Sequence, residues 1–135
     1  MRLENKTAIV TGGASGFGAG IAKRFAHEGA SVVVTDINDT EGESIANEIR
    51  DSGGDAVYVH ADVTSRSDTK QMISAAVERS GQLDILINNA GFSHANKSFT
   101  EVTDEEFDRV YNVNVKAVYI AIQEAIPVFK RQGHG

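Results

Sequence analysis

Four glycines fall within eight residues, TGGASGFG at 11–18, directly after the apolar run at 8–11. Glycine at Gly12, Gly16 and Gly18 lets a tight turn form and lets the backbone approach a bound group, because no Cβ stands in the way. Where such a turn leads into a helix, the first amides and the helix dipole attract an anion. The spacing therefore predicts a phosphate-binding turn; a tight strand-to-helix connection without a ligand is the alternative.

An acidic residue, Asp36, ends the next apolar run. A carboxylate at the end of a second strand can accept hydrogen bonds from both hydroxyls of an adenosine ribose. It would repel a 2′-phosphate, and Ser15 and Ile37 bring no positive charge to offset that repulsion. The pattern favours NAD over NADP. The other role open to Asp36, capping the next helix, is better filled by Asn38 or Thr40.

Short β-branched runs alternate with helical patterns along the chain. The candidate strands cover residues 8–11, 31–36, 56–60 and 83–88. Apolar residues at helical spacing separate them, and a glycine follows each of these three helical patterns. Strands that are nearly all apolar need cover on both faces, which helices on both sides of a parallel sheet provide. We therefore expect one α/β domain over 1–135: a Rossmann-like, doubly wound parallel sheet in three α/β/α layers, with about four βα units.

The last helical pattern is longer than the others and apolar around more of its circumference. Thr103 and Glu106 form a capping box at its start. Two apolar stripes follow over residues 107–125, which is more than one sheet face covers. We expect this helix to need a further partner, and we expect Pro127 to kink it or end it.

Composition excludes several classes of function. The net charge is −6 and no basic run is longer than a pair, which argues against nucleic-acid and anionic-membrane partners. The chain has no cysteine, and its four histidines share no ligand spacing, so we expect no disulfide and no metal site. No apolar run approaches the roughly 18 residues of a membrane span, and the start is too short for a signal peptide. The default expectation is a soluble cytoplasmic protein.

Five segments occur in a characteristic order: TGGASGFG (11–18), VVVTD (32–36), ADVT (61–64), NNAG (88–91) and YNVNVK (111–116). With them the chain resembles the short-chain dehydrogenase/reductase family over essentially its whole length, and in particular the group with glucose dehydrogenases and 3-oxoacyl reductases. The resemblance implies an NAD(P)-dependent oxidoreductase that moves a hydride between the nicotinamide and a small alcohol or carbonyl substrate. It also implies a homo-oligomer, a dimer or tetramer, formed through the last helix.

The resemblance assigns cofactor contacts to individual residues. They are Gly12, Ser15, Gly16, Phe17 and Gly18 at the diphosphate, Asp36 at the adenosine ribose, Asp62 and Val63 at the adenine, and Asn89, Ala90 and Gly91 at the nicotinamide ribose. For Asp62, a role in turning the chain after the third strand is an equal alternative. Asn88 is expected to tie neighbouring strands together, and Phe92, Ser93 and His94 are candidates to border a substrate.

Asn114 lies between Val110 and Val118 on an apolar stripe. A buried amide without partners costs on the order of 1–3 kcal/mol, so something should satisfy it. A local backbone hydrogen bond is one solution. The resemblance implies another, in which Asn114 is a catalytic residue that holds a water in the proton relay. Asn112 is expected to be structural.

The family's proton-transferring tyrosine and its lysine, spaced Tyr-x-x-x-Lys, do not occur here. Asp62, Val115 and Gln123 stand four residues after the three tyrosines. Lys116 follows Tyr111 by five residues, which turns it about 140° away on a helix.

The 135 residues therefore resemble the cofactor-binding half of a longer enzyme and are not expected to be active alone. A non-catalytic nucleotide-binding or interaction module that ends at Gly135 is the alternative. The fourth strand would have an unpaired edge and the last helix a bare face, so we expect the isolated chain to associate or aggregate.

Overall fold

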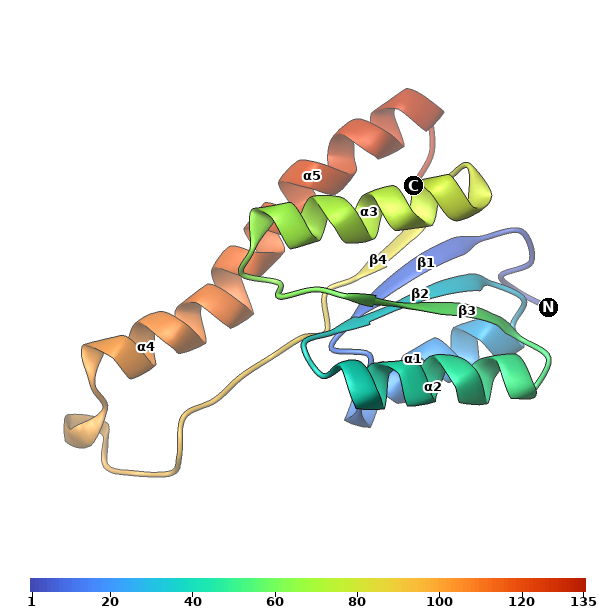
Figure 1. Ribbon diagram of the computed structural model, residues 1–135. Helices are drawn as coiled ribbons and strands as arrows, with labels where there is room; N and C mark the ends of the chain where they lie inside the picture. Colours follow the sequence, from blue (N-terminus) through green and yellow to red (C-terminus); the bar gives the residue numbers. More distant parts are fainter.

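The computed structural model describes all residues, 1–135. Its elements in order are β1 (Thr7–Thr11), α1 (Gly16–His27), β2 (Ser31–Asp36), α2 (Asp39–Asp51), β3 (Asp55–His60), α3 (Arg66–Ser80), β4 (Ile85–Ile87), the 3-10 turn η1 (Phe99–Glu101), α4 (Asp104–Tyr111), the π-helical segment η2 (Asn112–Lys116) and α5 (Ala117–Gln132). The four strands are parallel, in the order β3-β2-β1-β4. Helices α1 and α2 cover one face, and α3 and α5 cover the other (Figure 1). The predicted three-layer α/β fold is confirmed.

Alternation along the strands builds two cores, one on each face of the sheet. In β1, Val10 packs with α1 and α2, whereas Ile9 packs with α3 and α5. In β2, Val32 and Val34 belong to the first core and Val33 to the second. Successive strand side chains point to opposite faces, so a strand covered on both sides reads as one continuous apolar run.

The ends of the elements follow local signals in most places. Asn38 caps α2 by accepting from the amide of Glu41, and Thr103 and Glu106 form the expected capping box at α4. The fourth strand, β4, is shorter than the predicted 83–88, and the backbone of Leu83, before its start, is hydrogen-bonded to the side chain of Gln132 on α5.

Of the two outcomes expected at Pro127, a kink or the end of the last helix, the second does not occur. Helix α5 continues through Pro127 to Gln132. Val128 is buried in the second core, and the side chain of Gln132 accepts from Leu83 N at 2.9 Å and donates to Leu83 O at 2.6 Å. These tertiary contacts hold the last turn in place and outweigh the loss of one helical hydrogen bond at proline.

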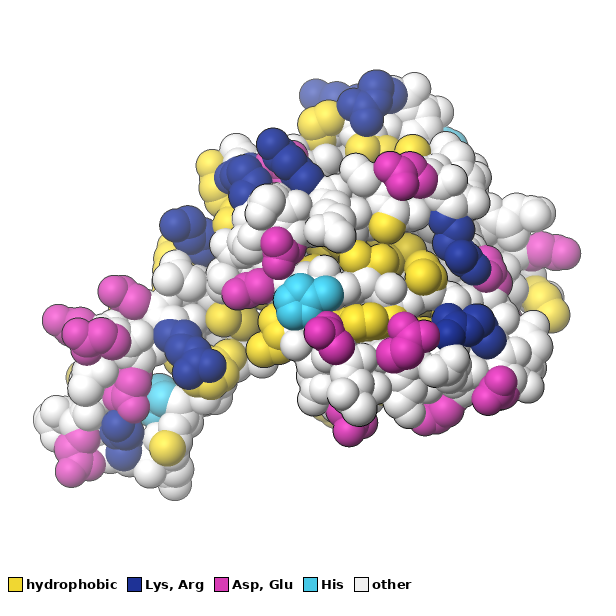
Figure 2. All heavy atoms as spheres, viewed as in Figure 1, with side chains coloured by type: hydrophobic (Ala, Val, Ile, Leu, Met, Phe, Trp, Pro, Cys, Tyr) yellow, Lys and Arg dark blue, Asp and Glu magenta, His cyan; other side chains and the backbone are white.

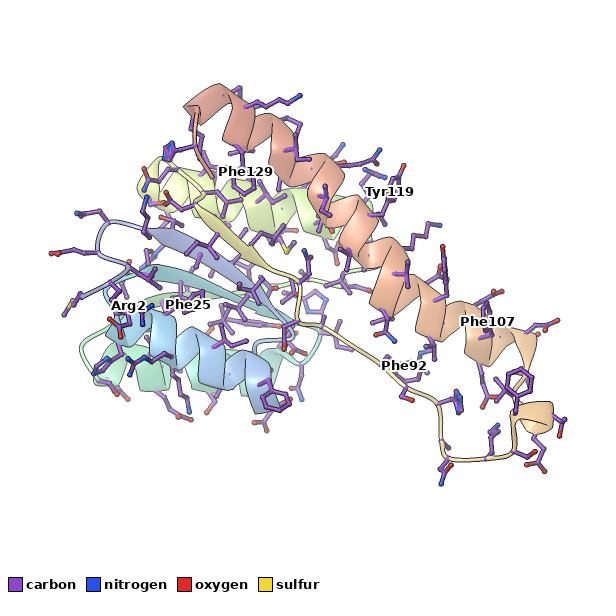
Figure 3. All side chains as sticks on the ribbon, turned by 180° about the vertical axis from the view of Figure 1, so that it is seen from behind. Arg2, Phe25, Phe92, Phe107, Tyr119 and Phe129 are labelled. Carbon is purple, nitrogen blue, oxygen red and sulfur yellow. The ribbon has the colours of Figure 1, made fainter.

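Elements α4, η2 and α5 follow one another without a break over residues 104–132, and an apolar stripe along them is exposed to solvent. Phe107, Tyr111, Val115, Tyr119, Ile122 and Ile126 are 41–63% exposed. Tyr119 points away from α3 and the sheet, whereas Phe129 points inward (Figure 3). On the opposite side of the molecule, hydrophobic side chains also show between α2 and α3, along the edge strand β3 (Figure 2). None of the helices combines the length and apolar character needed to cross a bilayer.

Candidate functional site

A cavity of about 460 Å³ lies at the carboxyl ends of the strands, as expected for an open parallel sheet. Its lining residues are Gly12, Ser15, Gly16, Phe17, Asp36, Ile37, Ala61, Asp62, Val63, Asn89, Ala90, Gly91, Phe92, Arg109 and Val113. Every cofactor-binding residue predicted from the sequence is among them except Gly18. The structure therefore brings together groups that come from four separate stretches of the chain.

A larger hollow of about 530 Å³ lies between the last turns of α1 and α2. It contains none of the predicted residues, and two of its side chains, Lys23 and Glu48, are paired with each other. It is flanked by helix C-termini, which do not attract anions. The smaller cavity, with the N-terminus of α1 in its wall, is the better candidate.

Three of the four glycines of the turn are needed, and not all for the same reason. Gly12 and Gly16 have φ of +63° and +52°, which other residues adopt only with strain. A Cβ on Gly12 would also lie 2.9 Å from the Cα of Ala90. Gly18 is buried behind the turn, where a Cβ would lie 2.0 Å from the carbonyl oxygen of Gly12. Gly18 therefore lets the first turn of α1 pack against the glycine turn and does not line the cavity.

Hydrogen-bond donors remain free where the turn enters α1. The amides of Gly16, Phe17 and Gly18 belong to the first turn of the helix and have no intrahelical acceptor. Ser15 stands at the N-cap position, but its hydroxyl makes no capping hydrogen bond. The side chain of Phe17 is 88% exposed, and its backbone amide lies in the first turn of the helix. This is an anion-binding arrangement.

Asp36 is fixed in place by backbone amides. Its Oδ2 accepts from the amide of Ala14 and its Oδ1 from the amide of Asn38, each at 3.1 Å. Each carboxylate oxygen keeps lone-pair capacity for a ligand in the cavity. The contact to Ala14 also ties the end of β2 to the glycine turn, a role that the sequence did not indicate.

Asp62 has one of the two roles that the sequence left as alternatives, turning the chain, and it also lines the cavity. Its Oδ1 accepts from the amide and the hydroxyl of Thr64, at 2.9 and 2.7 Å, which turns the chain after β3. The same residue lines the cavity, next to Val63.

Asn89, and not Asn88, ties neighbouring strands together. Its Nδ2 donates to the carbonyls of Thr11 and Gly12, and its amide donates to the Thr11 hydroxyl. Asn88 makes no side-chain hydrogen bond and faces the hollow between β4 and α5. The prediction for Asn88 is wrong because neighbouring side chains on an extended segment point to opposite sides.

Asn114 is exposed, so the predicted burial of this amide is wrong. It is satisfied by a distant backbone group and not by a local one. Its Oδ1 accepts from the amide of Phe92 at 2.9 Å, and its Nδ2 donates to the Phe92 carbonyl at 2.7 Å. It does not line the cavity, but it positions a residue that does.

Arg109 and Val113 line the cavity, and the sequence analysis missed both. The Arg109 guanidinium lies 3.9 Å from the centre of the Phe92 ring. Two signals pointed to them: they are four residues apart, on one face of a helix, and Phe92 directly follows Gly91. Of the suggested substrate-bordering residues, Phe92 lines the cavity, whereas Ser93 and His94 do not.

A small hydrogen-bonded cluster lies behind Asp36. The Tyr58 hydroxyl is 2.8 Å from the Asp36 carbonyl and 2.7 Å from the carboxylate of Asp39, which also contacts His60 Nδ1 at 2.6 Å. Burial and the Asp39 carboxylate raise the pKa of Tyr58. The hydrogen bond to Asp39 raises the pKa of His60. Tyr58 therefore stays protonated and braces the end of β2.

The site offers free amides, a free hydroxyl and two carboxylates around one cavity, which matches a diphosphate joined to a sugar diol. The lining residues include no tyrosine and no lysine. Asn89 donates to the carbonyls of Thr11 and Gly12, so it joins the segment after β4 to the segment after β1.

Comparisons with known proteins agree with this geometry. The family model described as short chain dehydrogenase matches residues 6–135. The chain is 47% identical to the 4-formylbenzenesulfonate dehydrogenase of Comamonas testosteroni, over all of this chain and 54% of that protein. It is 43% identical to the 2,5-dichloro-2,5-cyclohexadiene-1,4-diol dehydrogenase of Sphingobium indicum, over 99% of this chain and 53% of that protein.

A crystal structure of 3-ketoacyl-(acyl-carrier-protein) reductase from Brucella melitensis, complexed with NADH, superposes with a TM-score of 0.91 at 44% identity. It covers 97% of this chain and 53% of that chain. The chain thus spans about half the length of the relatives it matches. With its parallel sheet, its glycine turn and a family match that covers nearly every residue, the chain belongs to the short-chain dehydrogenase family.

Proposed function

We propose that this chain binds NAD in the cavity and forms the cofactor-binding half of an oxidoreductase that acts on an alcohol or a carbonyl compound. The observation that carries the proposal is the assembly of the glycine turn, Asp36, Asp62 and residues 89–91 around one cavity. NAD, when bound, supplies the hydride chemistry. The chain spans about half the length of its relatives, so the activity of a whole enzyme is itself part of the proposal.

Each part of the dinucleotide meets groups of matching chemistry. The free amides of α1 and the Ser15 hydroxyl donate to the diphosphate. Asp36 accepts from the hydroxyls of the adenosine ribose. Asp62 and the amide of Val63 bind the edge of the adenine, and the small residues at 89–91 leave room for the nicotinamide ribose.

NAD is preferred over NADP on this proposal. The Asp36 carboxylate repels a 2′-phosphate, and the neighbouring lining residues Ser15 and Ile37 carry no charge. The NADH complex of the Brucella reductase, a protein with 44% identity, supports the same preference.

Asn114 is assigned to the proton relay of the active site. Two of its polar groups are bonded to Phe92. A carboxamide has one further N–H and one further lone pair, so Asn114 keeps the capacity to hold a water.

The exposed stripe on α4 and α5 supports a homodimer or homotetramer. Analytical ultracentrifugation of the chain tests this expectation, and a monodisperse monomer would contradict it.

The cytoplasmic location stays a prediction.

The relatives' names support a small-molecule substrate. One is named for an aldehyde and the other for a ring diol, which are the two oxidation levels that hydride transfer connects. We infer the same reaction type for this chain.

Fluorescence titration with NADH and NADPH tests the proposal. The wild-type chain is expected to bind NADH at least tenfold more tightly than NADPH. Asp36→Arg should reduce that ratio by about tenfold or more, because it removes the diol acceptor and adds a partner for the 2′-phosphate. Asp51→Arg, at the exposed end of α2, is the matched control and should leave the ratio unchanged.

Two results would count against the proposal. An unchanged ratio in Asp36→Arg would remove Asp36 from the ribose site. The absence of NADH binding by a folded wild-type chain would remove the function itself.

A further inference from the structure

Arg109 is the only lysine or arginine that lines the cavity. Its guanidinium stacks on the Phe92 ring at 3.9 Å, and it forms no ion pair. Of the acidic residues on its own helix, Glu106 is paired with Lys97 at 2.6 Å. The others, Asp104, Glu105 and Asp108, do not pair with Arg109. The guanidinium is therefore a cation whose charge is not matched within the protein.

The ring under Arg109 is held in place by the backbone. Asn114 binds both the N–H and the C=O of Phe92, at 2.9 and 2.7 Å. Figure 3 shows Phe92 on the segment that runs alongside the α4 arm. The guanidinium N–H groups make no hydrogen bond within the protein, so they stay available for a ligand.

The order of the strands places Phe92, the residue that Arg109 contacts, away from the adenosine end. Asp36 and Asp62 follow β2 and β3, which lie on one side of β1 and its glycine turn. Phe92 follows β4, which lies on the other side of β1. With the diphosphate at the glycine turn, Arg109 lies on the side of the nicotinamide and of whatever reacts with it.

We propose that Arg109 determines substrate specificity by binding an oxyanion group of the substrate, a carboxylate or a sulfonate, while Phe92 contacts its apolar part. This inference rests on the proposed function, because it assumes NAD at the glycine turn. A guanidinium binds two oxygens of such a group at once, whereas a neutral amide or ester offers it one acceptor. The substrate class is thus an alcohol or carbonyl compound that carries an acidic substituent.

The test compares an anionic and a neutral probe of the same shape on the NADH-saturated chain. The probes are 4-(hydroxymethyl)benzoate and 4-(hydroxymethyl)benzamide, and the readout is the dissociation constant from NMR titration. The wild-type complex should bind the benzoate at least fivefold more tightly than the benzamide. Arg109→Gln should abolish that difference, and Arg109→Lys should restore part of it.

Arg131→Gln is the matched control, because Arg131 lies on α5, forms no ion pair and does not line the cavity. It should keep the wild-type difference between the probes. In Arg109→Gln, the affinity for NADH should stay within twofold of wild type.

Three results overturn the inference, and the NADH titration separates them from failure of the proposed function. If NADH binds but the wild-type complex binds both probes equally, or neither, Arg109 does not select an anionic substrate. If Arg109→Gln weakens NADH as much as it weakens the benzoate, Arg109 binds the cofactor's phosphates instead. If Arg131→Gln has the same effect as Arg109→Gln, the attraction is general and not local.

Discussion

Two aspartates at opposite ends of the sheet use the same side chain differently. Asp84, just before β4, is 9% exposed and is surrounded by donors within the protein: Thr7 N at 2.8 Å, Gln82 Nε2 at 2.8 Å and Lys6 Nζ at 3.0 Å. Asp36, at the end of β2, is half-buried and receives only two backbone amides. At the amino end of the sheet, protein donors reach both oxygens of the Asp84 carboxylate. At the carboxyl end, the Asp36 carboxylate keeps lone pairs that are open to a ligand.

The comparison of Asp84 with Asp36 indicates that polar groups stabilise the fold at the amino end of the sheet and stay open to a ligand at the carboxyl end. Buried polar groups stabilise a fold when the protein satisfies them, and the amino end of this sheet follows that rule. The carboxyl end leaves amides, a hydroxyl and carboxylates open to a cavity. Substitutions at the two ends should therefore affect different measurements.

The largest expected effect is at Asp84. Asp84→Ala leaves the Thr7 amide and Lys6 without their acceptor and should lower the free energy of unfolding by about 3 kcal/mol. Urea denaturation measures the loss. Asp55→Ala, which removes a partly exposed ion pair with Arg79, is the control and should cost under about 1 kcal/mol. Equal losses in the two variants would mean that the buried hydrogen bonds of Asp84 stabilise the fold no more than a partly exposed ion pair does.

The next effect compares two glycines of one helix. Gly18→Ala forces a Cβ against the Gly12 carbonyl, so it should cost about 2 kcal/mol and weaken NADH binding at least tenfold. At Gly20 an added Cβ meets nothing within 4 Å, so Gly20→Ala should stabilise α1 by about 0.5–1 kcal/mol. Thermal unfolding and NADH titration of both variants check this. Normal NADH affinity in Gly18→Ala would contradict the close packing of the turn.

Acid should weaken the amino end of the sheet through Asp84. Burial alone would raise the pKa of Asp84, but the Thr7 amide and Lys6 outweigh it and hold that pKa below its usual range. The stability from this shift is present above the unfolded-state pKa of about 3.9 and is lost as pH falls through the lower folded value. Urea midpoints from pH 6 to pH 2.5 should fall less steeply in Asp84→Asn. A slope identical to wild type would remove Asp84 from the acid response.

The smallest effect is expected at His60, at the carboxyl end of β3. The hydrogen bond to Asp39 raises the pKa of His60, and Asp68 and Asp62 add to the rise. Its small stabilisation is therefore present below about pH 6.5 and is lost as pH rises through the folded value. NMR titration should show a lower His60 pKa in Asp39→Asn than in wild type. Asp55→Asn should leave the His60 curve unchanged; a shift there too would point to a general charge effect.

Most of the fold could be predicted because it depends on local periodicity. Apolar strands bounded by glycine-ended helices leave few arrangements other than a covered parallel sheet. Pro127 shows the limit of such rules, because contacts of Val128 and Gln132 with distant residues override the local preference. No pattern within the last turn contains that information.

The site was predictable where it depends on the order of strands, and not where it depends on the shape of the last helix. The glycine turn and Asp36 follow adjacent strands and meet at one edge. The burial of Asn114 was misjudged because the π-helical segment Asn112–Lys116 interrupts the 3.6-residue repeat on which the stripe was counted. The contact of Arg109 with Phe92 was missed for another reason: it joins α4 to a loop residue 17 positions earlier, and no local pattern records such a contact.

The α4 arm extends from the body of the molecule, and none of its residues is buried (Figure 1). The ties described above attach it to residues 92–97: the amide pair of Asn114 with Phe92, the Arg109 stack and the Lys97–Glu106 ion pair. Such an element opens at lower free energy than a packed helix, so its amides should exchange with deuterium sooner than those of α3. A substrate that binds Arg109 must also hold the α4 arm closed. The arm then loses conformational entropy, which makes the substrate's affinity weaker than its contacts alone suggest.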